Sequence, residues 1–494
     1  MPLKLYNTIT RQKEPFIPLV AGKAGIYVCG ITAYDLCHIG HARSALVFDV
    51  IAKYLRYRGF EVTYIKNFTD VDDKIIDKAK AAGADIFAIS EKYIAAHDAD
   101  MDALGVGRPD QTPRATEHIA GMIVLVNKLI ANDLAYVIGG DVYFAVEKFK
   151  NYGKLAGRSL EDMLAGARVD VNEKKVNPLD FALWKASKEG EPWWDSPWGH
   201  GRPGWHIECS VMSQRFLGDT FDIHGGGEDL IFPHHENEIA QSEGATGKPL
   251  ANYWLHNGFV RVNSEKMSKS LGNFFTIRDM LEAYHPEVLR LFILQNHYRS
   301  PVDYTDTSLA EARQGMNRLY AVRKTIQDIL ADRPTAPSLP MELAGKHGET
   351  IGKINAQREK FVEAMDDDFN TARAVGCLFD ATRLINGYLA AKPSLTAPET
   401  IFVLHEAQQF FQEVGGVLGF FRKATDDYFL QDREREVRKL GLDVPEIERL
   451  IEARNAARTA KDWGKADEIR KTLAATNVFL KDSPTATTWS IERA

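Results

Sequence analysis

The chain has few cysteines, no long hydrophobic run and no excess of positive charge, and each shortage excludes a class of protein. Four cysteines among 494 residues are too few for a disulfide-linked scaffold. No apolar run approaches the length that crosses a membrane, and the N-terminal Met-Pro-Leu-Lys-Leu-Tyr has no signal-peptide pattern. We therefore expect a cytoplasmic protein in a reducing environment, with no membrane partner.

The overall charge and the length limit the organisation of the chain. A net charge of −7 does not by itself indicate nucleic-acid binding. Any nucleic-acid surface must be a local basic patch, because phosphate contact depends on local cations. A hydrophobic fraction of 45% is ordinary for a globular protein, and the length predicts two to four domains. There is no internal repeat and no long low-complexity segment.

The first chemically informative stretch follows a short apolar run that stops at Gly30, which predicts a buried strand. Apolar residues then recur at helical spacing and predict a helix that begins at His38-Ile-Gly-His41. Free N–H groups at a helix start attract phosphate, Gly40 permits close approach, and both imidazoles can donate hydrogen bonds. On these four residues alone, a helix start with two surface histidines is the better interpretation.

A second stretch, Lys266-Met-Ser-Lys-Ser270, places two lysines among small polar residues. Such a loop can close on an anionic phosphate, although a solvated turn would be favoured if the motif stood alone. Together and in this order, the His-Ile-Gly-His and Lys-Met-Ser-Lys-Ser motifs resemble the class I aminoacyl-tRNA synthetases.

The segments that flank these motifs narrow the resemblance to the cysteinyl-tRNA synthetase family, and the resemblance covers nearly the whole chain. These segments are Cys29-Gly-Ile-Thr, Thr69-Asp-Val-Asp-Asp-Lys74, Gly204-Trp-His-Ile-Glu-Cys209 and Phe232-Pro-His-His-Glu-Asn-Glu238.

The resemblance implies an α/β fold: a Rossmann-type parallel-sheet catalytic domain with an insertion, then an α-helical bundle and a small C-terminal domain. The expected domains are residues 1–113 and 202–306 (the two catalytic halves), 114–201 (insertion), 307–430 (tRNA-binding bundle) and 441–494 (anticodon-binding domain). Within the insertion we expect a helix near His118 to Ala131 and a strand from Asp141 to Val146. A polar loop through Trp184 and Trp198 should follow, and the sheet should resume near Trp205.

Polar residues end two predicted strands, where open α/β sheets place their ligands. Thr69 could face the pocket while Asp70 caps a helix. After the predicted strand Phe221-Asp-Ile-His224, a glycine loop leads to Asp229, whose carboxylate could accept hydrogen bonds from ribose hydroxyls. A flexible turn is the alternative for the glycines. The resemblance assigns Gly227 and Asp229 to the adenosine-binding segment.

His234 and Glu238 are four residues apart after Pro233, which suits the first position of a helix. At that spacing an imidazole and a carboxylate can share one metal ion. A buried cysteine is usually an apolar filler, so Cys29 and Cys209 would not be assigned as ligands on spacing alone.

The resemblance implies one Zn²⁺ per chain, held by Cys29, Cys209, His234 and Glu238 in a tetrahedral set. Trp205 is expected to form a wall of the substrate pocket. Four further residues are expected to orient the metal ligands: His206, His224, His235 and Glu236.

The C-terminal third predicts helices, a polar linker at 431–440 and a last small unit. In that unit four cations would align on one helical face, with Gly464 as an interruption; they are Arg454, Arg458, Lys461 and Lys465. A solvated charged face is the commoner meaning of such a run. The closing tail resembles that of the family, but Ala486 stands where glycine is expected.

The resemblance implies a monomeric enzyme that joins L-cysteine to tRNA(Cys) through cysteinyl-adenylate, with ATP and Mg²⁺ as substrate. The implied catalytic residues are His38, His41, Lys266 and Lys269. Gly40, Gly227, Asp229 and Lys269 are implied to bind ATP, and Thr69 and Trp205 to bind the amino acid.

Two other functions remain open at this point. A ligase that joins cysteine to an amino sugar would share the adenylation core but should lack a long tRNA-binding region. A non-catalytic RNA-binding protein with a structural zinc would have no reason to keep both phosphate motifs.

Overall fold

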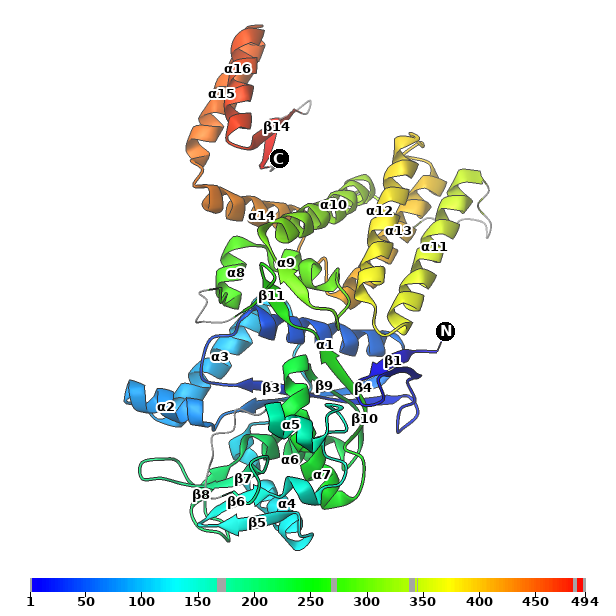
Figure 1. Cartoon of the computed structure of the whole chain (residues 1–494). Coiled ribbons are helices and arrows are strands. Elements are labelled where there is room, and N and C mark those ends of the chain that lie inside the picture. The colour runs from blue at the N-terminus through cyan, green and yellow to red at the C-terminus, as the bar shows by residue number, and fades with distance from the viewer. Residues whose placement is uncertain are drawn as a thin grey trace.

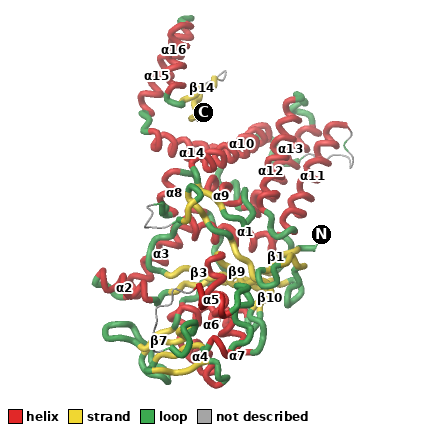
Figure 2. Tube along the Cα trace, in the orientation of Figure 1, coloured by secondary structure: helices red, strands yellow, loops and turns green. Residues whose placement is uncertain are grey.

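The computed structural model describes residues 2–166, 175–267, 273–336, 343, 345–482 and 487–491. One half of the molecule combines strands and helices around a parallel sheet, and the other half is almost wholly helical (Figure 1, Figure 2). In the part of the chain just delimited, no helix is both long enough and apolar enough to span a lipid bilayer.

The central sheet has four parallel strands in the order β10-β9-β3-β4. They are β3 (Lys23–Thr32), β4 (Glu61–Thr69), β9 (Phe221–Gly227) and β10 (Ala251–Asn257). The chain passes from β3 to β4 in one direction and later returns to β9 on the other side of β3. The strand order therefore reverses between β3 and β9, and open parallel sheets bind ligands beyond the carboxyl ends of such strands.

Helices cover both faces of this sheet (Figure 1). On one face lie α1 (Ile39–Tyr57) and α3 (Ile86–Leu104), with α2 (Asp73–Ala82) between them in sequence; on the other lie α6 (Trp205–Leu217) and α7 (Glu236–Thr246). The packing is close, because a Cβ at Gly225 would lie 2.3 Å from the ring of Phe48. Burial on both faces explains the continuous apolar run in β3.

The insertion has its own four-stranded antiparallel sheet, in the order β5-β6-β7-β8. Its elements are η1 (Ala115–His118), α4 (Ile119–Ala131), β5 (Ala135–Ile138), β6 (Asp141–Phe144), η2 (Val146–Lys148), α5 (Leu160–Gly166), β7 (Phe181–Ala186) and β8 (Gly201–Pro203).

Two sequence predictions for this region are wrong. Trp184 belongs to strand β7 and is fully buried, because it packs beneath Gly201, where a Cβ would lie 2.2 Å from the indole nitrogen. Trp205 does not resume the sheet but begins helix α6. The segment Gly201-Arg-Pro-Gly204 before it is typical of a turn and gave no indication of a helix start.

Short strands lie between the catalytic half and the helical half, and the longer helices that follow build the helical half. The strands are β1 (Lys4–Asn7), β2 (Gln12–Pro15), β11 (Val260–Val262), β12 (Glu265–Lys266) and β13 (Val302–Tyr304). The helices are α8 (Ile277–Ala283), α9 (Pro286–Leu294), α10 (Asp306–Leu330), α11 (Gly345–Asp366), α12 (Thr371–Ala390) and α13 (Pro398–Leu418). The apolar face of α10 is buried, for example at Leu319, Val322 and Ile326.

The linker predicted at 431–440 is wrong, because these residues belong to helix α14 (Thr425–Leu440). Tertiary contacts fix this polar helix against α10. Arg313 donates a forked pair of hydrogen bonds to Asp432, with N–O distances of 2.8–3.0 Å, and the Tyr428 ring stacks on Tyr320 at 3.8 Å.

The last unit comprises α15 (Val444–Thr459), α16 (Trp463–Ala475), β14 (Val478–Asp482) and β15 (Thr487–Ile491). It has a small core of its own, separate from the main core. The predicted alignment of four cations on one helix is wrong, because the chain turns at Ala460–Asp462, before Gly464. Ala486 lies outside the described residues.

Arg454 is also not a surface cation. Its guanidinium is buried and donates to both carboxylate oxygens of Asp482 at 2.9 and 2.8 Å, while Arg458 lies 2.9 Å from the same carboxylate. These bonds hold the pKa of Asp482 well below its usual value, and they tie α15 to strand β14.

We predict that Arg454→Ala destabilises the C-terminal unit by about 1–2 kcal/mol, since it removes a forked bond to a partly exposed carboxylate. Thermal unfolding of the full chain, followed by a probe in this unit, would measure the loss. The exposed pair Arg449–Glu446 provides the control, and Arg449→Ala should change stability much less, because water screens an exposed ion pair. Equal effects of the two substitutions would contradict the structural role of Arg454.

Candidate active site and metal centre

The four predicted metal ligands come together from separate elements. Cys29 is near the end of β3, Cys209 is on α6, His234 is in the short segment Ile231–His235, and Glu238 is on α7. One ligand atom of each residue lies within 4.8 Å of the other three, and all four side chains are buried. The two Sγ atoms are 3.5 Å apart, and Glu238 Oε1 is 3.2 Å from Cys29 Sγ and 3.0 Å from His234 Nε2.

Burial and close contact shift the pKa values of this cluster in opposite directions. Burial alone would raise the pKa of Glu238, but His224 and His234 hold it well below its usual value. Burial raises the pKa of the Cys29 thiol, whereas hydrogen bonds from Cys29 and His234 outweigh burial and lower the pKa of Cys209 to about 6. Binding of a metal would replace the proton of Cys29, and the two thiolates and the carboxylate would then bring three negative charges to the site. A buried divalent cation would offset most of that charge, and the mixed S, N and O donors suit zinc.

His224 and His206 contact the cluster, as expected. Nε2 of His224 lies 2.8 Å from Glu238 Oε2, and Nδ1 of His206 lies 2.9 Å from Nδ1 of His234. His235 lies beside them, 2.8 Å from His256 through its Nδ1. A second group of ligand atoms within 4.8 Å of one another shares two members with the first: Cys29, His224, His235 and Glu238.

The expectation that Glu236 orients a metal ligand is wrong. Its carboxylate points to the insertion and accepts hydrogen bonds from the backbone amides of Gly153, Leu155 and Ala156 at 2.9–3.0 Å. Glu236 is only two residues from Glu238, so on a helix the two carboxylates face in different directions.

The two predicted amino-acid contacts, Thr69 and Trp205, have different surroundings. The Trp205 ring is 39% exposed and packs against the ring of His234, with 4.3 Å between centroids, so it can form a pocket wall. Thr69 is buried, and its hydroxyl donates to Glu208 Oε2 at 2.6 Å. Asp70 caps η1 by accepting two hydrogen bonds from Thr116.

Sequence reasoning missed Tyr27, Asn67 and Glu208, which all approach the cluster. Asn67 Oδ1 accepts from the Gly30 amide at 2.9 Å and lies 3.6 Å from Cys209 Sγ. Burial and the nearby Cys209 raise the pKa of Tyr27, which keeps its phenol neutral. The period of two along a strand could have found both, since Tyr27 shares a face of β3 with Cys29, and Asn67 shares a face of β4 with Thr69.

The first phosphate motif begins α1, as predicted, with His38 as the N-cap. The amide of Gly40 donates to His38 Nδ1 at 3.0 Å, and the amide of His38 donates to His41 Nδ1 at 3.3 Å. Because each Nδ1 accepts, each neutral ring carries its proton on Nε2. Burial lowers the pKa of His41 well below its usual value, so this ring is neutral.

The expectation of free amides at this helix start is wrong for two residues. The Ile39 amide donates to Phe275 O at 3.3 Å, and the Gly40 amide donates to His38 Nδ1. A Cβ on Gly40 would lie 2.8 Å from the His38 ring, so glycine allows this compact turn. Phosphate contact at this turn would therefore use the imidazole Nε2 protons and the helix dipole.

The second phosphate motif lies beside the first. Met267 Cε is 3.9 Å from the position of a Cβ on Gly40, and Phe274 packs edge-on against His38 at 5.2 Å. Lys266 is in β12, and its backbone pairs with that of Arg261 in β11. The side chain of Lys266 and the whole of Lys269 lie outside the described residues.

The predicted adenosine segment sits at the carboxyl end of β9. The strand is longer than expected, because it continues through the glycines to Gly227. A Cβ on Gly226 would lie 2.8 Å from the His235 ring, which explains the need for glycine there. Asp229 follows in the short helix Glu228–Leu230 and is exposed.

Comparison with solved structures identifies the class of this fold. A Mycobacterium tuberculosis methionyl-tRNA synthetase in complex with methionyl-adenylate matches with a TM-score of 0.61, over 82% of this chain and 95% of that one, at 17% identity. Residues 15–314 match the family model for the tRNA synthetases class I (C) catalytic domain. The predicted fold class is therefore confirmed: the catalytic part is that of a class I tRNA synthetase.

The family follows from the rest of the chain. Residues 360–422 match a DALR domain, and 442–489 match the cysteinyl-tRNA ligase anticodon binding domain. The cysteine–tRNA ligase of Trichlorobacter lovleyi is 55% identical over 492 residues, and that of Geobacter sulfurreducens is 54% identical over 493; each alignment covers 100% of both chains. The chain belongs to the cysteinyl-tRNA synthetase family, as its motifs predicted.

Proposed function

We propose that this protein ligates L-cysteine to tRNA(Cys) in two steps with ATP. In the first step the cysteine carboxylate attacks the α-phosphorus, and cysteinyl-adenylate forms as pyrophosphate leaves. In the second step the terminal ribose 2′-hydroxyl of tRNA attacks the acyl carbon, and AMP leaves. The observation that carries this proposal is the buried thiol-rich cluster, in a chain of this family that also has both phosphate motifs.

The chain's own groups would act by position and charge, because the carboxylate and the ribose are themselves the nucleophiles. His38 and His41 would donate through Nε2 to phosphate oxygens from the start of α1. Lys266 and Lys269 would approach from the other side and offset the charge that builds up on the leaving pyrophosphate. Gly227 and Asp229 would hold the adenosine, and Mg²⁺ would arrive with ATP.

The metal cluster would select cysteine against serine. A pocket alone rejects such a near-isostere only about 10²-fold, whereas a specific bond to the substrate group reaches ~10⁴–10⁵. When bound by Cys29, Cys209, His234 and Glu238, zinc supplies a Lewis acid that prefers a thiolate to a hydroxyl. His224 would fix the carboxylate of Glu238, and Trp205 would exclude water beside His234.

We propose that residues 1–113 and 202–306 bind the small substrates, that 114–201 form an insertion, and that 307–430 and 441–494 contact the tRNA. The matches to a DALR domain and an anticodon binding domain support the last assignment and disfavour an amino-sugar ligase. We expect a monomer in the cytoplasm, which sedimentation and cell fractionation would test.

Pyrophosphate exchange tests the proposal directly. We expect ATP–pyrophosphate exchange that depends on cysteine and not on serine, together with cysteine transfer to tRNA(Cys). Exchange without charging, but with transfer to an amino sugar, would favour the other ligase. The absence of exchange would favour the RNA-binding alternative.

For the lysine loop, we predict that Lys269→Ala lowers kcat for adenylate formation more than it raises KM for ATP. A cation that meets charge only as pyrophosphate leaves acts mainly in the transition state, and its loss should cost about 10²–10³ in rate. Pre-steady-state formation of adenylate would measure the chemical step. An unchanged chemical rate would contradict the assignment of Lys269.

A further inference from the structure

The segment that follows the second phosphate motif is fixed to the first motif by its backbone. The amide of Ile277 donates to Cys37 O at 2.9 Å, and the amide of Ile39 donates to Phe275 O at 3.3 Å. These two hydrogen bonds form a short antiparallel bridge between the residues before α8 and the start of α1. The two motifs therefore share one backbone frame, which substitution of a side chain in this segment would leave in place.

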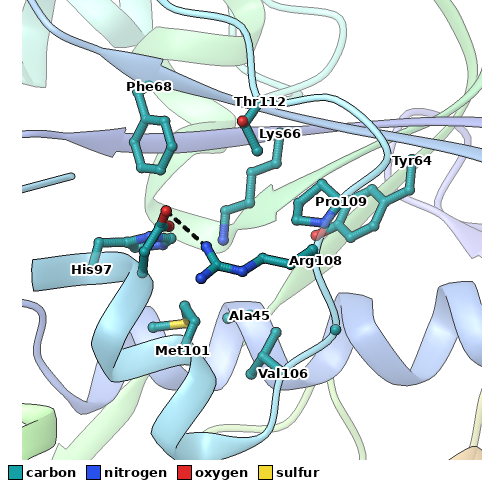
Figure 3. Close-up of a pocket in the computed structure, with 12 residues that line it drawn as sticks. Ala45, Tyr64, Lys66, Phe68, His97, Met101, Val106, Arg108, Pro109 and Thr112 are labelled. Carbon is teal, nitrogen blue, oxygen red and sulfur yellow. Dashed lines mark hydrogen bonds and ion pairs between the residues drawn. The ribbon is translucent and has the colours of Figure 1, made fainter. Parts of the chain in front are cut away.

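Helix α8 anchors this segment to α3. Nε of Arg278 donates to Asp100 Oδ1 at 2.9 Å, and Asp100 is buried. Two neighbouring carboxylates of α3 are paired with a different cation, because Arg108 extends toward this helix from the loop after it (Figure 3). Its nitrogens lie 2.7 Å from Asp98 and 2.6 Å from Asp102. The segment after the second motif is thus held by contacts with both α1 and α3.

Phe274 places its ring from this segment against the ring of His38. The two ring centroids are 5.2 Å apart and the ring planes meet at 70°, which is a favourable edge-to-face arrangement. His38 also stacks on His41 at 3.8 Å, and its Nδ1 accepts a hydrogen bond from the amide of Gly40. Because the second side-chain torsion of histidine has a broad energy minimum, the neighbours of the ring decide its orientation. The orientation of His38 therefore depends on the segment after the second motif as well as on α1.

We propose that Phe274 is a positioning residue for adenylate formation, which acts through His38. This inference rests on the proposed function, in which Nε2 of His38 donates to a phosphate oxygen. A hydrogen-bond donor lowers the barrier most when it is fixed where charge develops, and a displacement of about 1 Å can cost ~10²-fold in rate. By holding the imidazole, the Phe274 ring keeps Nε2 in place during the attack on the α-phosphorus. Phe274 has no polar group and takes no part in the chemistry itself.

Replacement of Phe274 by leucine tests this role in the full-length protein. Leucine keeps the side chain apolar and leaves the backbone frame intact, but it lacks the ring. We expect the pre-steady-state rate of adenylate formation to fall about tenfold or more, with a smaller change in KM for ATP. Phe274→Tyr keeps the ring and should retain most of the rate.

Phe275→Leu is the matched control for this experiment. Phe275 is likewise half-buried, but its ring packs on Tyr304 at 5.1 Å. Leucine at this position also leaves the backbone hydrogen bond to Ile39 in place. Loss of the Phe275 ring should therefore slow adenylate formation far less than loss of the Phe274 ring.

A double-substitution cycle separates positioning from a general loss of stability. If Phe274 acts through His38, Phe274→Leu should slow adenylate formation by less than about twofold once His38 is replaced by alanine. Losses that multiply in the double variant, or a wild-type rate in Phe274→Leu, would overturn the proposal.

A nuclear magnetic resonance measurement does not depend on activity. In protein with isotope-labelled histidine, the ring signal of His38 is identified by its absence from His38→Ala. Phe274→Leu should shift this signal, because the neighbouring ring current is removed, and Phe275→Leu should shift it much less. An unshifted signal in Phe274→Leu would overturn the proposal. If the signal shifts but the wild type shows no pyrophosphate exchange, the proposed function fails, and the role in adenylate formation with it.

Discussion

Replacing Cys209 by serine should lower the zinc content of the protein and its affinity for cysteine together. Cys209 Sγ lies 3.5 Å from Cys29 Sγ on a fully buried cluster, and a hydroxyl is a poor substitute for a thiolate ligand. We expect cysteine affinity to fall by about 10²-fold or more, which is the part of the selectivity that a pocket alone cannot supply. ATP affinity should change little, because the phosphate motifs lie on other loops. Metal analysis and binding titrations would measure both.

Cys37 offers a matched control for this experiment. It is an equally buried thiol, but it is not a member of either ligand group, so Cys37→Ser should keep zinc and cysteine binding. Equal losses of zinc in both variants would indicate a general effect on folding.

Cobalt in place of zinc would report on the open position of the metal. If the substrate thiol binds the metal, cysteine should increase the thiolate-to-cobalt charge-transfer absorption and serine should not. Cys29 and Cys209 contribute a constant background, so the difference spectrum is the observable. A closed structural site predicts no change with cysteine, and that result would falsify the selectivity mechanism without touching the family assignment.

Removal of residues 441–494 should abolish most tRNA charging and preserve cysteine activation. This unit has its own small core, built around Ile447, Ile451 and Leu473. Removal of the unit therefore leaves the main hydrophobic core intact. We expect kcat/KM for tRNA to fall roughly tenfold or more, which corresponds to about 1.4 kcal/mol or more of lost binding in the transition state. ATP–pyrophosphate exchange should remain near the wild-type rate.

The position of the cut decides whether only the C-terminal unit is removed or helix α14 is disrupted as well. A cut at Gln431 would remove Asp432, the partner of Arg313, and would split helix α14. A cut after Leu440 keeps this helix whole. Normal charging by the chain that ends at Leu440 would show that the required tRNA contacts lie elsewhere. Loss of pyrophosphate exchange would show that the C-terminal unit supports the catalytic domain.

Local sequence patterns predicted the parts of this protein that depend on neighbours along the chain. The helix that begins at His38 follows from apolar periodicity, and so does strand β3, although the strand continues past the predicted stop at Gly30 to Thr32. His234 and Glu238 lie 3.0 Å apart because residues four apart meet on one helical face. The family, and with it the proposed chemistry, followed from several short motifs that are specific only in combination.

The same patterns gave wrong predictions wherever a polar residue had a distant partner. The linker at 431–440 is a helix because Arg313 and Tyr320 pack against it from α10. Arg454 is buried because Asp482 lies across from it. A polar or charged residue has the same pattern in sequence whether it faces water or a partner.

The sequence alone determined the family, the fold class and the chemical kinds of group available for the site. Only the tertiary structure decided which of those groups meet. It brings together Cys29 and Cys209, which are 180 residues apart, and turns Glu236 toward the insertion. The physical reason is that periodicity and turn chemistry act over a few residues, whereas burial and charge pairing are set by the packing of helices on both faces of one sheet.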